Sequence, residues 1–423
     1  SGGDVATISR VLNLDAEDEV RIEIENEKNP TLFQHKVRLQ HGTSIVMFKI
    51  NGDFASAHYT ANTNTVTTTG NITAFSGSTG TGGDPLGGTI VSLSSSVNFN
   101  HINGRFTPDS DRIFLYYSSW IYDLAAASAA NEYNHKLTRD GSGVGLQEVS
   151  IPLDSSSMPG DSTYMILKQV DNDQYAQIKR DDTSDIGVGF TYVSGTAFSL
   201  IDISDNGTLP SSFFSGHINS DSSVLGTGLI NMYSETDRGS YTLQTPLTDS
   251  LGANTGIALN ETNGRFTFPE AGDYLLINKI QVDSAASGIK TSHSIRLNGT
   301  NEIYFSEFLN NDSFDPHGKI ATVIASVNKN DYVEFMCSGT NAKLDDGMGV
   351  VIIQMSDTIP SGSGVDLFNR NLSVFNSYDV SSQYTLETIT QPPFILGARG
   401  YGVTRKNDTA LVVDPGDKSN TDD

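Results

Sequence analysis

The stretch Val327-Asn328-Lys329-Asn330-Asp331-Tyr332-Val333 is the clearest sign of the fold, because a polar turn opens a strand there. The apolar run Val350-Val351-Ile352-Ile353-Gln354-Met355 follows it. This pair of segments occurs twice more along the chain. The turn returns as Leu14-Asp15-Ala16-Glu17-Asp18-Glu19-Val20 and Val170-Asp171-Asn172-Asp173-Gln174-Tyr175-Ala176, and the run as Ile45-Val46-Met47-Phe48-Lys49-Ile50 and Phe198-Ser199-Leu200-Ile201-Asp202-Ile203. A period of about 157 residues is the size of a domain, so the sequence predicts a tandem array of related β domains.

A second marker occurs in two of the three copies. It reads Asn103-Gly104-Arg105-Phe106-Thr107 and Asn263-Gly264-Arg265-Phe266-Thr267. The first copy therefore has a closing half without an opening half. Two explanations stay open: a processed or truncated N-terminus, or missing strands that come from the C-terminal tail or a neighbouring chain. We expect the closing half of a first domain over 1–50, a second domain over 51–205, a third over 206–357, and a C-terminal arm or cap over 358–423.

Composition favours an all-β protein, since short strand-like runs alternate with turn clusters such as Asp140-Gly141-Ser142-Gly143. The formal charge of −24 argues against nucleic acid and against an anionic membrane surface as partners. No apolar run approaches the roughly 20 residues that cross a bilayer, so we expect no membrane insertion. The single cysteine, Cys337, excludes an internal disulfide and a thiolate zinc site.

The third copy resembles a known family. Gly264-Arg265-Phe266, then Pro269-Glu270-Ala271-Gly272-Asp273-Tyr274, the turn at 327–333 and the closing strand at 349–355 are similar to the C1q/TNF-like jelly roll. The match is best over about 217–357 and weaker over 51–205, where Pro108-Asp109-Ser110-Asp111-Arg112-Ile113 replaces the Gly-x-Tyr turn. The predicted fold class is all-β, with tandem C1q/TNF-like jelly-roll β-sandwiches and a C-terminal extended arm.

The resemblance implies trimers, because domains of this family associate about a threefold axis. It predicts a homotrimer with an aromatic interface formed by Tyr274, Tyr304, Phe305, Phe308, Tyr332 and Phe335. The alternative is that the sandwich itself, or a neighbouring repeat, uses both faces of each sheet. Tandem copies allow either a stacked homotrimeric shaft or a pseudo-trimer made by one chain, and the sequence leaves both open.

The sequence carries no catalytic signature, since zinc-protease, nucleophile-elbow and phosphate-loop motifs are missing. We therefore expect no enzymatic activity. Acidic residues in the loop before the closing strand have a chemistry that suits calcium, because calcium prefers oxygen ligands on loops. The favoured interpretation is solvated surface carboxylates, and a calcium site is the alternative. These candidate ligands are Asp181, Asp182 and Asp185 in the second copy, and Asp345 and Asp346 in the third.

The tail from Asp357 onward differs from the repeats and includes an apolar stretch, 392–401. It predicts either an extended arm that docks on another subunit or a local cap on the third domain. The predicted anchors are Phe394, Ile395, Leu396 and Tyr401, and Arg399 and Arg405 would contact an acidic surface.

These features favour a non-enzymatic structural protein on the outer surface of a virus or bacteriophage particle, as a capsid decoration, head fibre or tail appendage. Its expected partners are further copies, other virion proteins and a host surface glycan or receptor. The alternative is a bacterial extracellular C1q-like adhesin or carbohydrate-binding protein. A polysaccharide depolymerase is the third class.

Overall fold

A computed structural model gives the structure of the chain. It describes these residues: 19–20, 37–39, 44–47, 50, 52–60, 72–73, 75, 89–100, 102–124, 132–140, 148–152, 160–181, 190–192, 196–203, 209–218, 228–238, 243–244, 255–284, 289–310, 317–339, 342–344, 348–355, 374–378, 384–386, 399–401, 403–406 and 410–413. They form antiparallel strands and, within these ranges, one short helix, α1 (Glu235–Arg238). The all-β prediction is confirmed.

The strands from β4 to β15 form a sandwich, which we call sandwich A. Its inner sheet has the order β12-β9-β15-β4-β6, with β14 on β9, and its outer sheet has the order β11-β10-β13-β8-β7, with β5 on β13. The inner strands are β4 (Phe54–Tyr59), β6 (Thr89–Leu93), β9 (Arg112–Leu124), β12 (Gly160–Val170), β14 (Phe190–Tyr192) and β15 (Ala197–Asp202). The outer strands are β5 (Ile72–Thr73), β7 (Val97–Asn100), β8 (Arg105–Pro108), β10 (Glu132–Arg139), β11 (Glu148–Pro152) and β13 (Ala176–Asp181).

The strands from β16 to β27 form sandwich B with the same strand order. The inner sheet runs β24-β21-β27-β16-β18, with β26 on β21, and the outer sheet runs β23-β22-β25-β20-β19, with β17 on β25. The inner strands are β16 (Phe213–Ile218), β18 (Leu243–Gln244), β21 (Gly272–Ser284), β24 (His317–Val327), β26 (Ala342–Leu344) and β27 (Gly349–Gln354). The outer strands are β17 (Gly228–Asn231), β19 (Ala258–Asn260), β20 (Arg265–Thr267), β22 (Ile289–Leu297), β23 (Asn301–Asn310) and β25 (Tyr332–Gly339).

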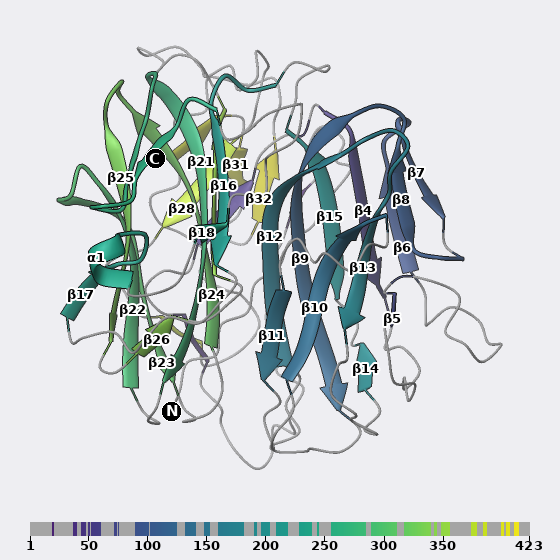
Figure 1. The fold of residues 1–423 in the computed structure, drawn as a ribbon, viewed down its shortest axis with the longest axis horizontal. Helices are drawn as coiled ribbons and strands as arrows, with labels where there is room; N and C mark the ends of the chain where they lie inside the picture. The colour runs from purple at the N-terminus through teal and green to yellow at the C-terminus, as the bar shows by residue number, and fades with distance from the viewer. Residues whose placement is uncertain are drawn as a thin grey trace.

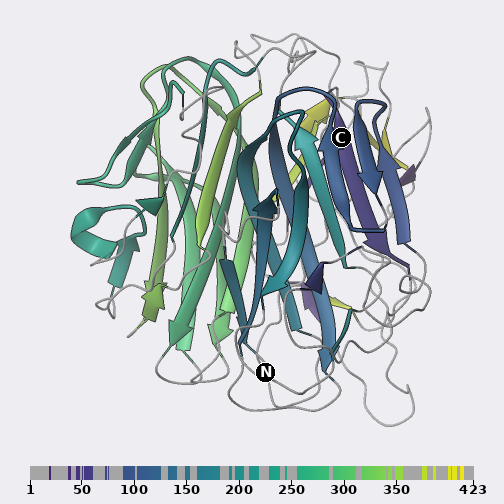
Figure 2. The same cartoon turned by 45° about the vertical axis from the view of Figure 1, so that its right-hand side comes forward.

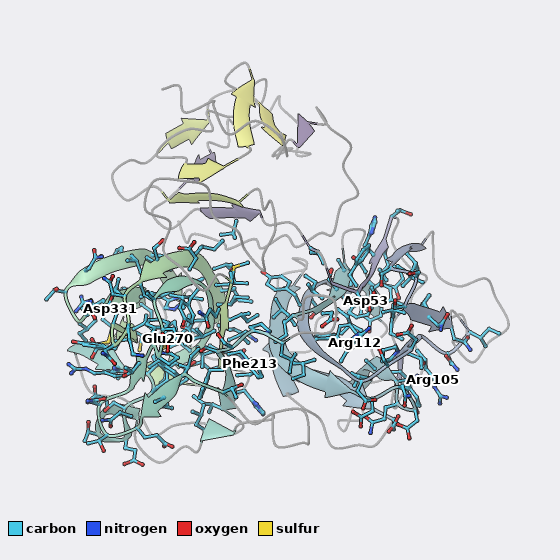
Figure 3. The ribbon with its side chains drawn as sticks, turned by 90° about the horizontal axis from the view of Figure 1, so that it is seen from above. Asp53, Arg105, Arg112, Phe213, Glu270 and Asp331 are labelled. Carbon is cyan, nitrogen blue, oxygen red and sulfur yellow. The ribbon has the colours of Figure 1, made fainter. Side chains whose placement is uncertain are left out.

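Strands from the two ends of the chain form a third group, the terminal unit. Its sheets have the orders β3-β28-β30, β1-β32-β31 and β2-β29. The strands are β1 (Glu19–Val20), β2 (Val37–Leu39), β3 (Ser44–Met47), β28 (Val374–Tyr378), β29 (Tyr384–Leu386), β30 (Arg399–Tyr401), β31 (Val403–Lys406) and β32 (Ala410–Val413). Seen from above in Figure 3, the purple and yellow strands of this unit form a group of their own beside the green and blue sandwiches.

The pairings of the terminal unit repeat those of the sandwiches. Val46 of β3 lies opposite Asn376 of β28, as Ser199 lies opposite Ser56 and Val351 opposite Ser215. Of the explanations for the incomplete first copy, the described strands therefore favour completion by the tail of the same chain. The tail's described strands pair with N-terminal strands, which is neither the predicted docking on another subunit nor a cap on sandwich B. The domain bounds stay a prediction.

Aromatic and aliphatic side chains fill the interior of each sandwich. In sandwich B, Phe266 contacts Phe214, Tyr233 and Phe335 edge-on, with ring centres 5.0 to 5.5 Å apart. In sandwich A, Phe198 takes a similar central place against Phe75, Phe106 and Tyr116. The four sheets of the two sandwiches stand side by side in Figures 1 and 2, so the inner sheets face one another.

Candidate interaction surfaces

The Asn-Gly-Arg-Phe marker forms the turn between β7 and β8 in sandwich A and between β19 and β20 in sandwich B. Gly104 and Gly264 have φ of 63° and 66°, which glycine adopts with little cost. In each turn the asparagine Oδ1 accepts the arginine backbone N–H at 3.3 Å. Phe106 and Phe266 then point into the cores. The marker is thus a turn whose conformation places the following phenylalanine in the core of its sandwich.

The arginine of each marker lies on a tyrosine ring. The Arg105 guanidinium carbon is 3.9 Å from the ring centre of Tyr175, and that of Arg265 is 4.2 Å from Tyr332. The backbone N–H of each tyrosine donates at 3.1 Å to the side chain of a residue with positive φ, Asp140 or Asn298. The two outer sheets therefore end in matching arginine–tyrosine pairs.

The two pairs differ in how their turns are held. In sandwich B, the Asn231 amide donates to the Asn263 carbonyl at 2.9 Å, and Glu334 binds the Arg265 Nε at 2.9 Å. In sandwich A, Gln177 stands at the position of Glu334 and donates to the Asn103 carbonyl at 2.7 Å. Hydrogen bonding to Glu334 raises the pKa of Arg265. Of the two equivalent positions, the one in sandwich B therefore has a carboxylate, Glu334, and the one in sandwich A has an amide, Gln177.

The inner sheets meet along an apolar seam. Ile113 and Leu115 of sandwich A cluster with outward-facing residues of sandwich B, and all are at most 9% exposed. These are Phe213, Leu275, Ile277, Ile320, Val351, Ile353 and Met355, joined by Ile203 at the end of β15. Neighbouring residues of one strand face different cores: Leu275 packs in the seam, whereas Leu276 packs inside sandwich B. Phe213 lies between the two sandwiches in Figure 3.

The seam also takes in the terminal unit, because Val46 packs against the same cluster. Strand β12 of sandwich A packs on β27 of sandwich B, and the corresponding strand β24 of sandwich B packs on β3 of the terminal unit. The closing strands β15, β27 and β3 all contribute a side chain to this cluster, through Ile201, Ile353 and Val46. The contact that joins sandwich A to sandwich B is therefore repeated between sandwich B and the terminal unit, around one shared apolar cluster.

Beyond the apolar part, the inner sheets carry a repeated polar pattern. Phe54-x-Ser56-x-His58 on β4 matches Phe213-x-Ser215-x-His217 on β16, with the two serines opposite Ser199 and Val351. The Ser56 and Ser199 hydroxyls lie 3.1 Å apart. Ser215, His217 and Lys279 are almost fully buried. The apolar seam thus gives way to a buried polar region along the same faces.

Arg112 explains the departure of the second copy at its turn. It lies opposite Val170, where Gly272 lies opposite Val327 in sandwich B. Its guanidinium is 3.0 Å from Asp53 and 3.3 Å from Asp202, whose side chain is buried. Ion pairs from Arg112 to Asp53, next to β4, and to Asp202, at the end of β15, therefore take the place of the glycine turn. Figure 3 labels Arg112 and Asp53 in the same part of sandwich A.

The aromatic interface prediction is wrong for three of its residues. Tyr274, Tyr304 and Phe335 are at most 1% exposed inside the core of sandwich B, because they occupy the inward positions of their strands. The ring of Tyr332 packs against the Arg265 guanidinium, and Phe305 is half-buried on β23. The side chain of Phe308 lies outside the described residues.

The interior of sandwich B also contains a polar network. The Asn278 amide donates to the Tyr233 hydroxyl at 2.8 Å and to the Gly349 carbonyl at 2.9 Å, while its Oδ1 lies 2.6 Å from His293 Nε2. Cys337 is buried nearby in the same core, and burial raises the pKa of its thiol to about 12. A neutral thiol of this kind is a poor nucleophile.

The other predicted sites are only partly described. Asp181 is the last residue of β13, whereas Asp182, Asp185, Asp345 and Asp346 lie outside the described residues. No group of three metal-binding side chains occurs in the described ranges. Arg399 and Tyr401 are in β30 and Arg405 is in β31, but Phe394, Ile395 and Leu396 are not described. Calcium binding and the arm contacts stay predictions.

The seam residues are the main feature missed in the sequence. Their signal is the unbroken apolar runs Leu275-Leu276-Ile277 and Val350-Val351-Ile352-Ile353, which indicate strands buried on both faces. The predicted interface consisted of aromatic residues and did not include these aliphatic ones.

No protein-family model and no curated protein sequence matches the chain. Among solved structures, Eiger TNF from S. frugiperda is similar, with 12% identity and a TM-score of 0.26. That match covers 36% of this chain and 99% of the Eiger chain. In the described part of the chain, no helix has the length and apolar character needed to cross a bilayer.

Proposed function

We propose that the protein is a non-enzymatic structural protein of a virus or bacteriophage particle, in which one chain forms a three-unit, trimer-like body. The supporting observation is the seam. Closing strands from three parts of the chain contribute Ile201, Ile353 and Val46 to one apolar cluster. Area buried between sheets stabilises such an arrangement at about 25 cal/mol per Å².

This arrangement favours a pseudo-trimer over a homotrimer. The faces that separate subunits would use for association lie against each other within one chain, since Leu275, Ile277 and Ile353 are at most 2% exposed. Trimer-like geometry then needs no second molecule. The outer sheets, with their arginine–tyrosine pairs, remain as the surfaces for other virion proteins or a host surface glycan or receptor.

The absence of structural disulfides supports a particle protein that folds in a reducing compartment before it acts outside a cell. Cys337 is buried and its thiol pKa is raised. Stability therefore comes from the two interior cores and the seam, which do not depend on an oxidising environment.

Solution mass tests the single-chain arrangement. Light scattering on the purified chain should give a mass near 45.5 kDa. A stable mass three times larger would contradict the pseudo-trimer and support the homotrimer. Repeating the measurement with a chelator tests whether calcium contributes to assembly.

Labelling tests the proposed location. Gold-labelled antibodies against the chain should bind virus particles purified from the same biological material. Labelling of bacterial envelopes without labelling of particles would contradict the virion role and favour the extracellular adhesin.

A further inference from the structure

A row of alternating charges crosses the outer sheet of sandwich B. The neighbouring strands β20, β25, β22 and β23 contribute one charged side chain each. The Arg265 Nε lies 2.9 Å from a carboxylate oxygen of Glu334. The Arg296 guanidinium lies 3.6 Å from Glu302, and Arg296 is directly opposite Glu334 in the pairing of β22 with β25. From β20 to β23, the signs therefore read plus, minus, plus, minus.

The charged row lies on the face of this sheet that points away from the sandwich interior. Phe335 and Ile295 belong to the interior core. Alternation along a strand places their neighbours Glu334 and Arg296 on the other face. The four charged side chains remain between 13% and 41% exposed. In Figure 1, β25 and β22 stand on the side of sandwich B opposite to sandwich A, so the row is separate from the seam.

A row of this kind is complementary to a second copy of itself in one orientation. A two-fold axis parallel to the strands, passing between Glu334 and Arg296, reverses the order of the four positions. It places Arg265 of one copy opposite Glu302 of the other. Glu334 of one copy then faces Arg296 of the other. Every charge in the row therefore faces one of opposite sign, as an interface that pairs one surface with itself requires.

We propose that the outer face of sandwich B is a binding surface for a second copy of this chain, paired about this two-fold axis. The inference goes beyond the proposed function, because it assigns one outer sheet to contacts between copies. Opposite charges across an interface fix its register, whereas like charges disfavour other arrangements.

The adjacent row of side chains supports the same orientation. Ser294 lies between Met336 on β25 and Phe305 on β23. Asn231 on β17 lies on the other side of Met336. The two-fold axis places Met336 of one copy over Ser294 of the other, and it places Phe305 over Asn231. Large side chains then face buried ones, since Ser294 and Asn231 are 2% and 4% exposed.

Sandwich A has a different row at the corresponding positions. There the outer sheet carries Arg105, Gln177 and Thr138. These three positions hold one charge, so they do not match a second copy through alternating signs. The proposed surface is therefore a property of sandwich B and not of the fold that the two sandwiches share.

The contact between copies is small. Four strands about 4.8 Å apart, with about eight residues each, make a face of roughly 500 Å². Two such faces bury about 1,000 Å², at the lower end for specific interfaces. The formal charge of −24 also opposes contact between copies, although salt at about 0.15 M screens charges more than about 8 Å apart. We therefore expect a weak dimer that forms at high concentration.

Two single substitutions in the full chain allow a test by mixing. Glu302→Lys alone, and Arg265→Glu alone, put like charges opposite each other in a dimer of identical copies. In a mixed pair of the two variants, both contacts regain opposite signs. We expect the equimolar mixture to associate at least about tenfold more tightly than either variant by itself.

Light scattering from about 1 μM to about 1 mM chain measures this association. The single-chain mass is 45.5 kDa, and a dimer has twice that mass. The matched control is Arg105→Glu, at the equivalent position of sandwich A, and it should leave the association of the wild type unchanged. Circular dichroism checks that each variant is folded. The pair Arg296→Glu and Glu334→Arg repeats the test at the inner contact, and it replaces the first pair if one of those variants does not fold.

A mixture that associates no more tightly than the separate variants would overturn the proposal. A wild type that keeps the single-chain mass at about 1 mM would do the same. So would an Arg105→Glu variant that associates as poorly as Arg265→Glu. The pseudo-trimer is judged by the mass of the dilute chain without mixing, so failure of this surface and failure of the proposed function are distinguishable.

Discussion

At the scale of single residues, the turn glycines give the most direct test of the marker. A Cβ on Gly264 would lie 2.2 Å from the Asn231 Oδ1, and the φ of +66° is unfavourable for alanine. We expect Gly264→Ala to lower the free energy of unfolding by about 1 to 3 kcal/mol. Gly228→Ala is the control, because Gly228 also has positive φ but nothing within 4 Å. Urea unfolding should give a clearly lower free energy of unfolding for Gly264→Ala than for Gly228→Ala. Equal losses of stability would contradict a clash between the added Cβ and Asn231.

The arginine–tyrosine pairs allow a comparison within one molecule. Arg265 packs on the Tyr332 ring and is hydrogen-bonded to Glu334. Arg105 packs on the Tyr175 ring, and the residue equivalent to Glu334 is Gln177, which bonds the Asn103 carbonyl. A double-mutant cycle of Arg265→Ala and Glu334→Gln should give a coupling of about 0.2 to 1 kcal/mol that shrinks in high salt, since the pair is partly exposed. The matching cycle of Arg105→Ala and Gln177→Ala should show little dependence on salt. Salt-independent coupling at Arg265 would argue against the ion pair.

Cys337 predicts a loss of stability at alkaline pH. Burial, and then the charge of Asp237, raises the pKa of its thiol from 9.0 to about 12. Between these values the unfolded chain releases a proton that the folded chain keeps, so the free energy of unfolding falls as pH rises. The slope is at most about 1.4 kcal/mol per pH unit. Urea unfolding from pH 8 to 11 should show a shallower fall for Cys337→Ala than for the wild type. Identical slopes would contradict a raised pKa.

At the scale of strands, β21 separates the interior core from the seam. Leu276→Ala should cost sandwich B about 2 to 5 kcal/mol, as for other buried leucines. Leu275→Ala leaves that interior intact and weakens the seam. We expect calorimetry to show one cooperative transition for the wild type, two transitions for Leu275→Ala, and a lower melting temperature for Leu276→Ala. If Leu275→Ala melted like the wild type, the seam would contribute little to the stability of the molecule.

The strands were the most predictable part of the molecule. The turn at 327–333 and the apolar run at 350–355 identify β25 and β27, and the Asn-Gly-Arg-Phe marker identifies β8 and β20, because local turn chemistry specifies them. The direction of each side chain was less predictable. Tyr274 and Leu275 are neighbours and both apolar, so which of them faces the interior depends on strand pairing distant in sequence.

At the scale of the whole molecule, the pairing of the two chain ends is open to a covalent test. Val46 and Asn376 lie directly opposite each other, and opposed side chains in antiparallel strands have Cβ atoms about 5 Å apart. In a Cys337→Ala background, Val46→Cys with Asn376→Cys should form an intramolecular disulfide under mild oxidation. Ile45→Cys with Asn376→Cys is the control, because its sulfurs point to opposite faces. The readout is faster migration on a non-reducing gel, and equal cross-linking of both pairs would contradict this register.

The closure of the terminal unit was among the alternatives that the sequence left open. The first copy ends with its own closing strand, and this pattern is the same whether the opening strands come from the tail, a neighbour or an earlier segment. Short strands such as Glu19–Val20 and Val403–Lys406 carry too little alternation to identify a partner. Pairing across the length of the chain depends on tertiary packing, which a single sequence does not display.

The pairing of β3 with β28 also has a consequence during synthesis on the ribosome. Val46 and Asn376 are roughly 330 residues apart, and translation at about 5 to 20 residues per second takes about 17 to 66 seconds to cover that distance. Sandwiches A and B have their strands available earlier, so they can fold while β3 still lacks β28. The nascent N-terminal segment must therefore avoid other strand edges during this interval, and chaperones that hold extended apolar chains are expected to raise the yield of folded protein.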